Sequence, residues 1–225
     1  MPGIPDIAPY PMPGEDDLPA NTAQWKVAPD RAVLLVHDMQ RYFLRPFADA
    51  QRERLTGNVA ALRERCAHLG IPVAFTAQPG SMTPEQRGLL REFWGPGMRL
   101  DEEDRAVTDE LAPRSGDRVF TKWRYSAFHR SDLHTWLRDQ GRDQLIVCGI
   151  YARIGVLATA VDAFTHDLET FLVADAVADF TAEDHHLALG YAARRCAVVA
   201  TTRGLPTAGG TLLGRSAAPA AGAVV

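Results

Sequence analysis

The chain has 225 residues, of which 46% are hydrophobic and 23% are charged, and its formal net charge is -4. This composition is typical of a folded globular protein and excludes a disordered or fibrous chain. Basic residues are scattered, and no apolar run approaches the roughly 20 residues that span a bilayer, so neither nucleic acid nor a membrane is the expected partner. We expect a small molecule instead.

Three cysteines, Cys66, Cys148 and Cys196, are spread along the chain. Their odd number and the lack of a signal-peptide pattern argue against a disulfide framework and favour a cytoplasmic protein. Each lies within an apolar helical or strand pattern, so we expect small buried hydrophobic side chains rather than reactive thiols.

The first 30 residues contain seven of the fifteen prolines. Proline fixes the backbone φ angle and lacks an amide hydrogen, so residues 1–30 are predicted to form an extended arm that packs on the core. Residues 31–204 are predicted to form one catalytic domain. Residues 205–225 are rich in Ala, Gly and Pro without strand or helix periodicity and are predicted to be disordered.

Six short apolar runs rich in β-branched residues are predicted to be strands: 32–36, 73–76, 118–121, 144–148, 170–174 and 197–201. Their nearly continuous apolarity indicates strands that are covered on both faces. Helical patterns occupy most of the intervals. The expected fold class is therefore α/β, with three layers and a six-stranded, mostly parallel sheet flanked by helices.

Polar residues follow several of these strands, at the edge where open α/β sheets bind ligands. Asp38, Gln78 and Lys122 follow the first, second and third strands, and Asp175 follows the fifth. An acid, an amide and a base are therefore expected to converge. His37 should point to the opposite side of the strand end from Asp38, which favours a structural histidine with satisfied hydrogen bonds.

An acid and a base at such an edge suit hydrolysis, in which charge develops on the substrate. No nucleophile accompanies this acid and base. Where the fourth strand turns into a helix, the free backbone amides of the first helical turn make an anion site. In the segment GIYARIGVLATAVDAF the residue at this turn is Gly155. The sequence therefore predicts an acid–base site without a nucleophile.

Six segments resemble the isochorismatase family within the cysteine-hydrolase superfamily: LLVHDMQRYF, FTAQPGSMTPEQRGLL, FWGPGM, TKWRYSAFHRSDL, GRDQLIVCGIYARIGVLATAVDAF and FLVADAVADF. The resemblance covers residues 4 to about 203 and implies an isochorismatase-like fold, a homodimer and no cofactor or metal. The superfamily generally uses an Asp, Lys and Cys triad. Asp38 and Lys122 match it, whereas Gly155 stands where the cysteine would be, so a covalent thiol adduct is unavailable there.

Isochorismatases cleave a vinyl ether, which becomes electrophilic once its methylene carbon is protonated, so a general acid suffices. We expect Asp38 to be that acid. Burial would raise its pKa and Lys122 would lower it, while the carboxylates of the substrate favour the protonated form. Lys122 is then left either to hold a substrate carboxylate or to orient Asp38.

The phenazine-pathway branch of the family carries glycine at the same place and also resembles the chain in AQPGSMT, EQRGLL and FWGPGM. This resemblance implies hydrolysis of 2-amino-2-deoxyisochorismate to trans-2,3-dihydro-3-hydroxyanthranilate and pyruvate. The helix start at Gly155 would take a substrate carboxylate, and the Ile150–Tyr151 bond would be cis. The implied substrate-binding residues are Gln78, Arg87, Trp94, Tyr151 and Gly155.

Several alternatives stay open. An isochorismate hydrolase would release 2,3-dihydro-2,3-dihydroxybenzoate and pyruvate from a substrate with a hydroxyl in place of the amine, and the sequence does not separate the two. A catalytically silent family member would have no need of a buried acid and base. An amidase of the nicotinamidase type would need a thiol at position 155. Arg153, where isochorismatases more often have histidine, could face solvent, a neighbouring subunit or the substrate.

Overall fold

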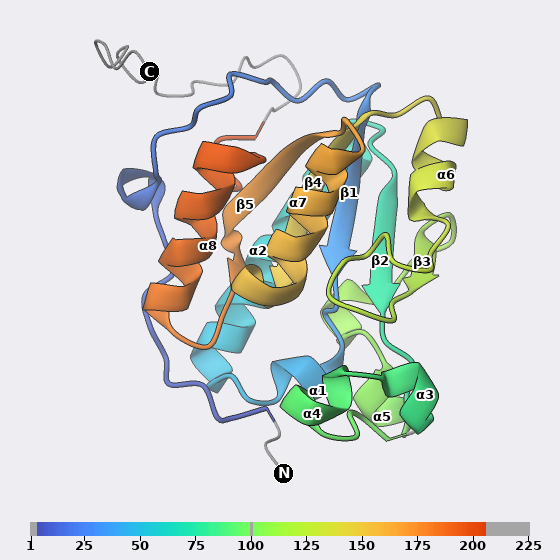
Figure 1. The fold of residues 1–225 in the computed structure, drawn as a ribbon. Helices are drawn as coiled ribbons and strands as arrows, with labels where there is room; N and C mark the ends of the chain where they lie inside the picture. The colour runs from blue at the N-terminus through green and yellow to red at the C-terminus, as the bar shows by residue number, and fades with distance from the viewer. Residues whose placement is uncertain (1–3, 100, 206–225) are drawn as a thin grey trace, which may run out of the picture.

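A computed structural model describes residues 4–99 and 101–205 (Figure 1). One sheet has the strand order β3-β2-β1-β4-β5-β6, and every neighbouring pair is parallel. The α/β prediction is confirmed, with a sheet that is parallel throughout. The strands are β1 (Ala32–His37), β2 (Val73–Ala77), β3 (Arg118–Thr121), β4 (Gln144–Ile150), β5 (Glu169–Ala178) and β6 (Val198–Ala200).

Helices cover both faces of the sheet (Figure 1). Alternate residues of β1 point to opposite faces, so Leu34 and Val36 pack with α2 and the N-terminal arm, while Val33 and Leu35 pack with α6, α7 and α8. Strands covered in this way are continuously apolar, as the sequence predicted. These four helices are α2 (Asp49–His68), α6 (Leu133–Asp139), α7 (Leu157–Thr165) and α8 (Ala182–Arg195).

Four shorter helices gather at the end of the molecule toward which the arrowheads of β1 and β2 point (Figure 1). The sequence predicted only one of them, in PEQRGLL, because a single helical turn is too short to show periodicity. They are α1 (Arg41–Leu44), α3 (Pro84–Arg87), α4 (Leu90–Trp94) and α5 (Glu102–Arg105); single turns also occur at Glu15–Asp17, Asp109–Leu111 and, as a π-helix labelled η3, at Ala152–Val156.

The expectation that Asp175 faces the ligand-binding edge is wrong. Val147 of β4 pairs with Leu172 of β5, but Gly149, two residues later, pairs with Val177, which is five residues later. The strand β5 therefore carries a large bulge and ends only at Ala178. Asp175 lies in this bulge. Its carboxylate accepts hydrogen bonds of 2.6 Å from the backbone amide and the hydroxyl of Thr202, which ties it to the chain after β6.

The N-terminal segment lies along the body of the molecule. Ile7 is buried and pairs with Phe47 in an isolated bridge. The hydroxyl of Tyr10 accepts a 2.7 Å hydrogen bond from the Asp179 amide and lies 3.1 Å from Nδ1 of His185. At the other end Leu205 is buried. The remainder of the tail that the sequence predicts to be disordered, residues 206–225, lies outside the described residues.

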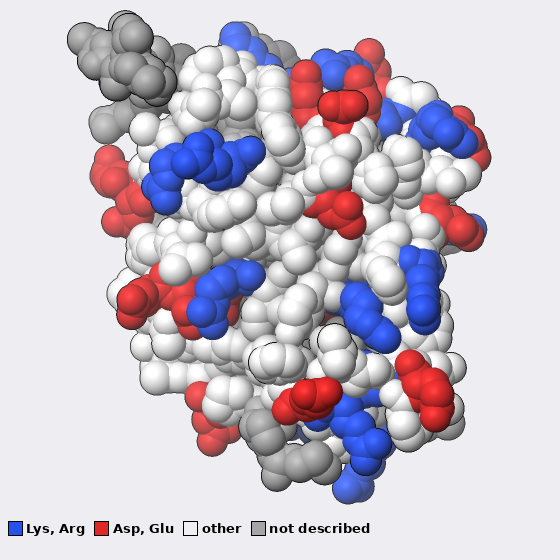
Figure 2. Space-filling model, in the orientation of Figure 1, with Lys and Arg blue, Asp and Glu red and all other residues white. Residues whose placement is uncertain are grey.

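Charged side chains of both signs are interspersed on the face that Figure 2 shows, and neither sign forms a continuous patch there. None of the helices in residues 4–99 and 101–205 combines the length and the apolarity that a bilayer crossing requires.

Candidate active site

A cavity that is partly open to solvent lies beyond the carboxyl ends of the central strands. Parallel strands deliver their end residues to one edge of a sheet, so side chains that are distant in the sequence meet there. The cavity is lined by the seven residues predicted to be catalytic or substrate-binding: Asp38, Gln78, Arg87, Trp94, Lys122, Tyr151 and Gly155.

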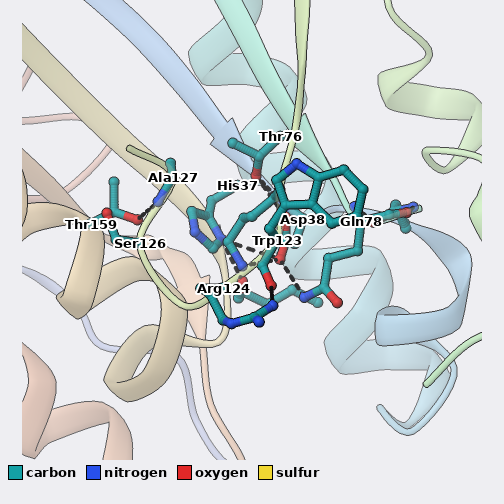
Figure 3. Close-up of polar contacts among 12 residues, drawn as sticks. His37, Asp38, Thr76, Gln78, Trp123, Arg124, Ser126, Ala127 and Thr159 are labelled. Carbon is teal, nitrogen blue, oxygen red and sulfur yellow. Dashed lines mark hydrogen bonds and ion pairs between the residues drawn. The ribbon is translucent and has the colours of Figure 1, made fainter. Parts of the chain in front are cut away.

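Asp38 and Lys122 form a buried ion pair at the floor of the cavity. Lys122 Nζ lies 2.8 Å from Asp38 Oδ2. Lys122 is 2% exposed and Asp38 is 4% exposed. The hydroxyl of Thr76 donates to Oδ1 at 2.6 Å, and Nε2 of Gln78 donates to Oδ2 at 3.4 Å (Figure 3). The carboxylate is therefore held on both oxygens.

Asp38 has an unusual backbone conformation, with a φ angle of +50°. This left-handed region costs a residue other than glycine roughly 1 kcal/mol or more, and such residues cluster at functional sites. The conformation turns the chain sharply at the end of β1 and is held by a 3.1 Å hydrogen bond from the Asp38 amide to the Thr76 hydroxyl. The turn brings the carboxylate into the cavity.

Opposing influences act on the pKa of Asp38. Burial is the largest and raises the pKa, but the charge and hydrogen bond of Lys122, together with the Thr76 hydrogen bond, lower it below the ordinary value. Asp38 is thus ionised in the unliganded protein at neutral pH. It becomes an acid only when a bound ligand adds negative charge, excludes water or draws Lys122 away.

Arg87 lies against the same cavity and is only 7% exposed. Its Nε donates to the Gly95 carbonyl at 3.0 Å, and its Nη1 donates to Oε1 of Gln78 at 3.3 Å. A Cβ atom on Gly97, whose φ angle is +81°, would lie 2.9 Å from the guanidinium carbon, so glycine is needed there. Arg87 is therefore not a solvated surface charge.

Two aromatic side chains close the cavity. Trp94 stacks on Phe180 and donates from Nε1 to the Tyr125 hydroxyl at 2.8 Å. Tyr151 stacks on Phe180 with ring centroids 4.4 Å apart, and its hydroxyl donates to the Phe43 carbonyl at 2.7 Å. Because the hydroxyl is engaged, Tyr151 presents its ring or its backbone to a ligand. The bond between Ile150 and Tyr151 is cis, which confirms that prediction.

The helix start beside the cavity is already partly occupied by a protein carboxylate. Asp179 accepts hydrogen bonds from the backbone amides of Arg153 and, at 2.8 Å, Phe180. Burial raises the pKa of Asp179. The amides of Ile154 and Val156 donate to the Tyr151 carbonyl at 3.1 and 3.2 Å, so these two amides are also engaged within the protein. The Arg153 side chain is exposed, pairs with Asp184 at 3.0 Å and does not line the cavity, so it does not face the substrate site.

Gly155 lines the cavity from η3, and a Cβ atom on it would meet the side chain of His37. Nδ1 of His37 donates to the Ile150 carbonyl at 2.9 Å, but Nε2 is buried without a hydrogen bond of normal geometry to any described residue. The prediction of a fully satisfied structural histidine is therefore only half right. Burial, with Lys122 as a further cause, lowers the pKa of His37 to about 4 against the opposing pull of Asp38.

Two buried histidines predict acid sensitivity. Burial lowers the pKa of both His37 and His185 to about 4, whereas an unfolded histidine titrates near 6.5. Between these values the unfolded chain binds more protons than the native state, so stability falls as the pH falls. We expect the free energy of unfolding in urea to drop by about 2 kcal/mol per histidine between pH 7 and pH 4.5.

His185→Gln serves as the control for this prediction, because glutamine keeps hydrogen-bonding groups near Tyr10 and the Ala174 carbonyl but does not titrate. The loss of stability on acidification should be smaller in this variant. Equal losses in both proteins would contradict the prediction.

All three cysteines are buried, as the sequence predicted. Burial raises the pKa of Cys66 to about 12 and that of Cys196 to about 11, and it raises the pKa of Cys148 well above its usual range. None of them lines the cavity. The site therefore has no thiol nucleophile, and among the described residues no three His, Cys, Asp or Glu side chains are grouped as a metal site.

Sequence reasoning missed most of the apolar wall. This wall comes from the arm, from α1 and α4, and from the segments after α4, β3 and β4. Apart from two tyrosines, its residues carry no titrating group. Tyr42 is the most informative omission, since burial raises the pKa of its hydroxyl. The missed residues include Ile4, Tyr42, Phe43, Leu90, Met98, Tyr125 and Ile154.

The profile of the isochorismatase domain matches residues 32–204. The chain belongs to the isochorismatase family. It is 61% identical over 202 residues to the phenazine biosynthesis protein PhzD of Pseudomonas fluorescens, covering 90% of this chain and 98% of that protein. It is 50% identical over 204 residues to the isochorismatase of Bacillus subtilis, covering 90% of this chain and 65% of that longer protein.

Solved isochorismatase-like structures share the architecture. A cysteine hydrolase from Pseudomonas syringae pv. phaseolicola superposes with a TM-score of 0.74 over 82% of this chain and 94% of that one. Its sequence identity of 24% shows a common fold alone. The family assignment and the shared architecture therefore agree with the parallel sheet of this chain.

Proposed function

We propose that the protein is an isochorismatase-type hydrolase that cleaves the enolpyruvyl vinyl ether of 2-amino-2-deoxyisochorismate to trans-2,3-dihydro-3-hydroxyanthranilate and pyruvate. The observation that carries this proposal is a buried Asp38–Lys122 pair that faces Gly155 where a nucleophile would stand. The 61% identity to PhzD, a phenazine biosynthesis protein, supports the same conclusion.

The reaction needs one proton and one water molecule. Protonated Asp38 gives its hydrogen to the methylene carbon, forming a C–H bond and leaving an oxocarbenium ion. Water adds to the cationic carbon and returns a proton to the Asp38 carboxylate. The hemiketal hydroxyl then gives up its proton and becomes the ketone oxygen of pyruvate. At the same time the bond to the ring oxygen breaks and that oxygen takes up a proton, which gives the ring alcohol. No bond to the protein forms at any step.

The charges around the cavity suit a dianionic substrate. Arg87 and Lys122 are cations that line the cavity, and a carboxylate can accept a bidentate pair of hydrogen bonds from a guanidinium. A substrate carboxylate near Lys122 would weaken the hold of that cation on Asp38. Negative charge and water exclusion then raise the pKa of Asp38, so binding the substrate itself prepares the acid.

Comparative turnover tests this proposal. We expect the purified protein to release pyruvate from 2-amino-2-deoxyisochorismate with a kcat/KM at least about 10-fold above that for isochorismate, because a buried hydrogen-bonding group discriminates strongly. A coupled lactate dehydrogenase assay measures the pyruvate. The reverse preference would identify an isochorismate hydrolase, which the 50% identity to the isochorismatase of B. subtilis makes the second candidate. Release from neither substrate would identify a silent family member.

We further propose that residues 31–204 carry the activity, that the arm of residues 1–30 completes the cavity wall through Ile4, and that the protein acts as a homodimer in the cytoplasm. Ile4 supports the part assigned to the arm, since it lines the cavity.

A further inference from the structure

His37 and Gly155 are in contact at the wall of the cavity. A Cβ atom built on Gly155 would lie 2.4 Å from Cε1 and 3.1 Å from Nε2 of the His37 ring. Carbon atoms that are not bonded to each other attract best at about 3.5–4.0 Å, so neither alanine nor cysteine fits at position 155 while the ring stays in place. The ring is fully buried, and close packing limits its freedom to move aside.

Backbone conformation does not explain the glycine. Several glycines in the chain, such as Gly97, have positive φ angles, but Gly155 is not among them. It lies inside the single turn η3, whose right-handed backbone other residues adopt. Space is therefore the requirement that selects glycine at position 155, and the imidazole of His37 creates that requirement.

The imidazole is itself fixed in place. Its Nδ1 lies 2.9 Å from the Ile150 carbonyl, and because a carbonyl only accepts, Nδ1 carries the hydrogen. Ile150 is the last residue of β4 and directly precedes Tyr151, which lines the cavity. The ring is thus held by a hydrogen bond on one side and by the bare backbone of Gly155 on the other.

We propose that His37 is a positioning residue, whose neutral ring occupies the space that a nucleophilic side chain at position 155 would need and supports the wall formed by Tyr151 and Gly155. The role of His37 in vinyl ether hydrolysis rests on the proposed function. The steric coupling between residues 37 and 155 does not depend on that function. The absence of a side chain at position 155 and the buried ring of His37 depend on each other. A side chain at position 155 becomes acceptable only when residue 37 is smaller.

A double-mutant cycle tests the coupling without any substrate. We expect Gly155→Cys to lower the thermal midpoint by about 5–10 °C, as overpacking of a core does. Valine at position 37 removes the ring atoms that collide, so the shift of His37→Val/Gly155→Cys should be clearly smaller than the sum of the two single shifts. Gly57→Ala is the matched control, since a Cβ there meets nothing within 4 Å, and its combination with His37→Val should be additive.

Thiol labelling adds a readout that stability alone does not give. In the folded His37→Val/Gly155→Cys protein, the introduced thiol should react with iodoacetamide at least about 10-fold faster than the three buried native cysteines, because position 155 faces the cavity.

Four results would each overturn the proposal: additive shifts at positions 37 and 155, an undamaged Gly155→Cys protein, an introduced thiol that reacts as slowly as the native cysteines, or failure of the double variant to fold. The proposed function is tested separately. If the wild type released no pyruvate, that function would fail and the steric coupling measured by the cycle would stand.

Discussion

Replacing Asp38 by asparagine is expected to lower kcat for pyruvate release by about 10³-fold, within the range of about 10²–10⁴ that a positioned general acid contributes. Asparagine keeps the size of the side chain and accepts the hydrogen bond from Thr76, but it carries no proton that it can give to carbon. KM should change much less than kcat, because Arg87 and the aromatic wall remain. Steady-state kinetics with the coupled pyruvate assay measures both quantities.

The control for this variant is Asp143→Asn, which removes a carboxylate that is paired with Arg31 on the surface. It should leave kcat unchanged. The thermal midpoint of Asp38→Asn should also be measured, because the change leaves Lys122 buried without its partner. Turnover that survived in a folded Asp38→Asn protein would defeat the proton-transfer mechanism.

Replacing Lys122 by methionine removes a cation that lines the cavity and can hold a substrate carboxylate. We expect this loss to outweigh the larger protonated fraction of Asp38 and to reduce kcat/KM at pH 7 by about 10²-fold. The substitution should also reverse the direction of the Asp38 pKa shift. In the wild type Lys122 holds this pKa below the ordinary value. Without the cation, burial dominates and raises it. The pH above which kcat/KM declines should therefore move upward, since kcat/KM reports the ionisation of the free enzyme. A pH–rate profile of both proteins measures this shift.

The same substitution changes how stability depends on pH. In the wild type the pKa of Asp38 is lower in the folded protein than in the unfolded chain, where it is near 3.9. Asp38 therefore stabilises the fold at pH values above 3.9, and this contribution is lost as the pH falls through the pKa of the folded protein. In Lys122→Met the raised pKa reverses the sign, so stability is lost as the pH rises through the folded value. Unfolding in urea should show a loss of about 3–5 kcal/mol at pH 7 that becomes smaller at pH 5.

Lys122→Arg separates charge from shape. Arginine keeps the positive charge, so the pH profile should stay close to that of the wild type even if the larger group lowers kcat. An unchanged pH profile in Lys122→Met would show that the lysine does not control the protonation of Asp38.

The sheet and the acid–base pair were predictable from the sequence for one physical reason. Strands covered on both faces must be continuously apolar, so the polar residues that follow each run mark the edge where ligands bind. Asp38, Gln78 and Lys122 follow that rule. Asp175 breaks it, because the bulge in β5 delays the end of that strand, and no pattern of apolar residues announces a bulge.

Side-chain relations across the chain were harder to predict. The tyrosine at position 151 marks the site, but only the structure shows that its hydroxyl is engaged by the Phe43 carbonyl. The contact between His37 and Gly155 joins residues that are distant in the sequence and depends on the register of β1 and β4, in which His37 pairs with Gly149. A one-residue slip in this register would have put the histidine on the other face.

The burial of all three thiols limits how oxidants and covalent inhibitors can react with this enzyme. Peroxide and electrophilic warheads consume thiolates, and the raised pKa values of Cys66, Cys148 and Cys196 keep these groups protonated in a neutral cell. Oxidative stress that silences cysteine-dependent hydrolases of the same fold would therefore spare this active centre. An inhibitor would have to compete for the cavity through reversible contacts, since no thiol lines it to anchor a permanent bond.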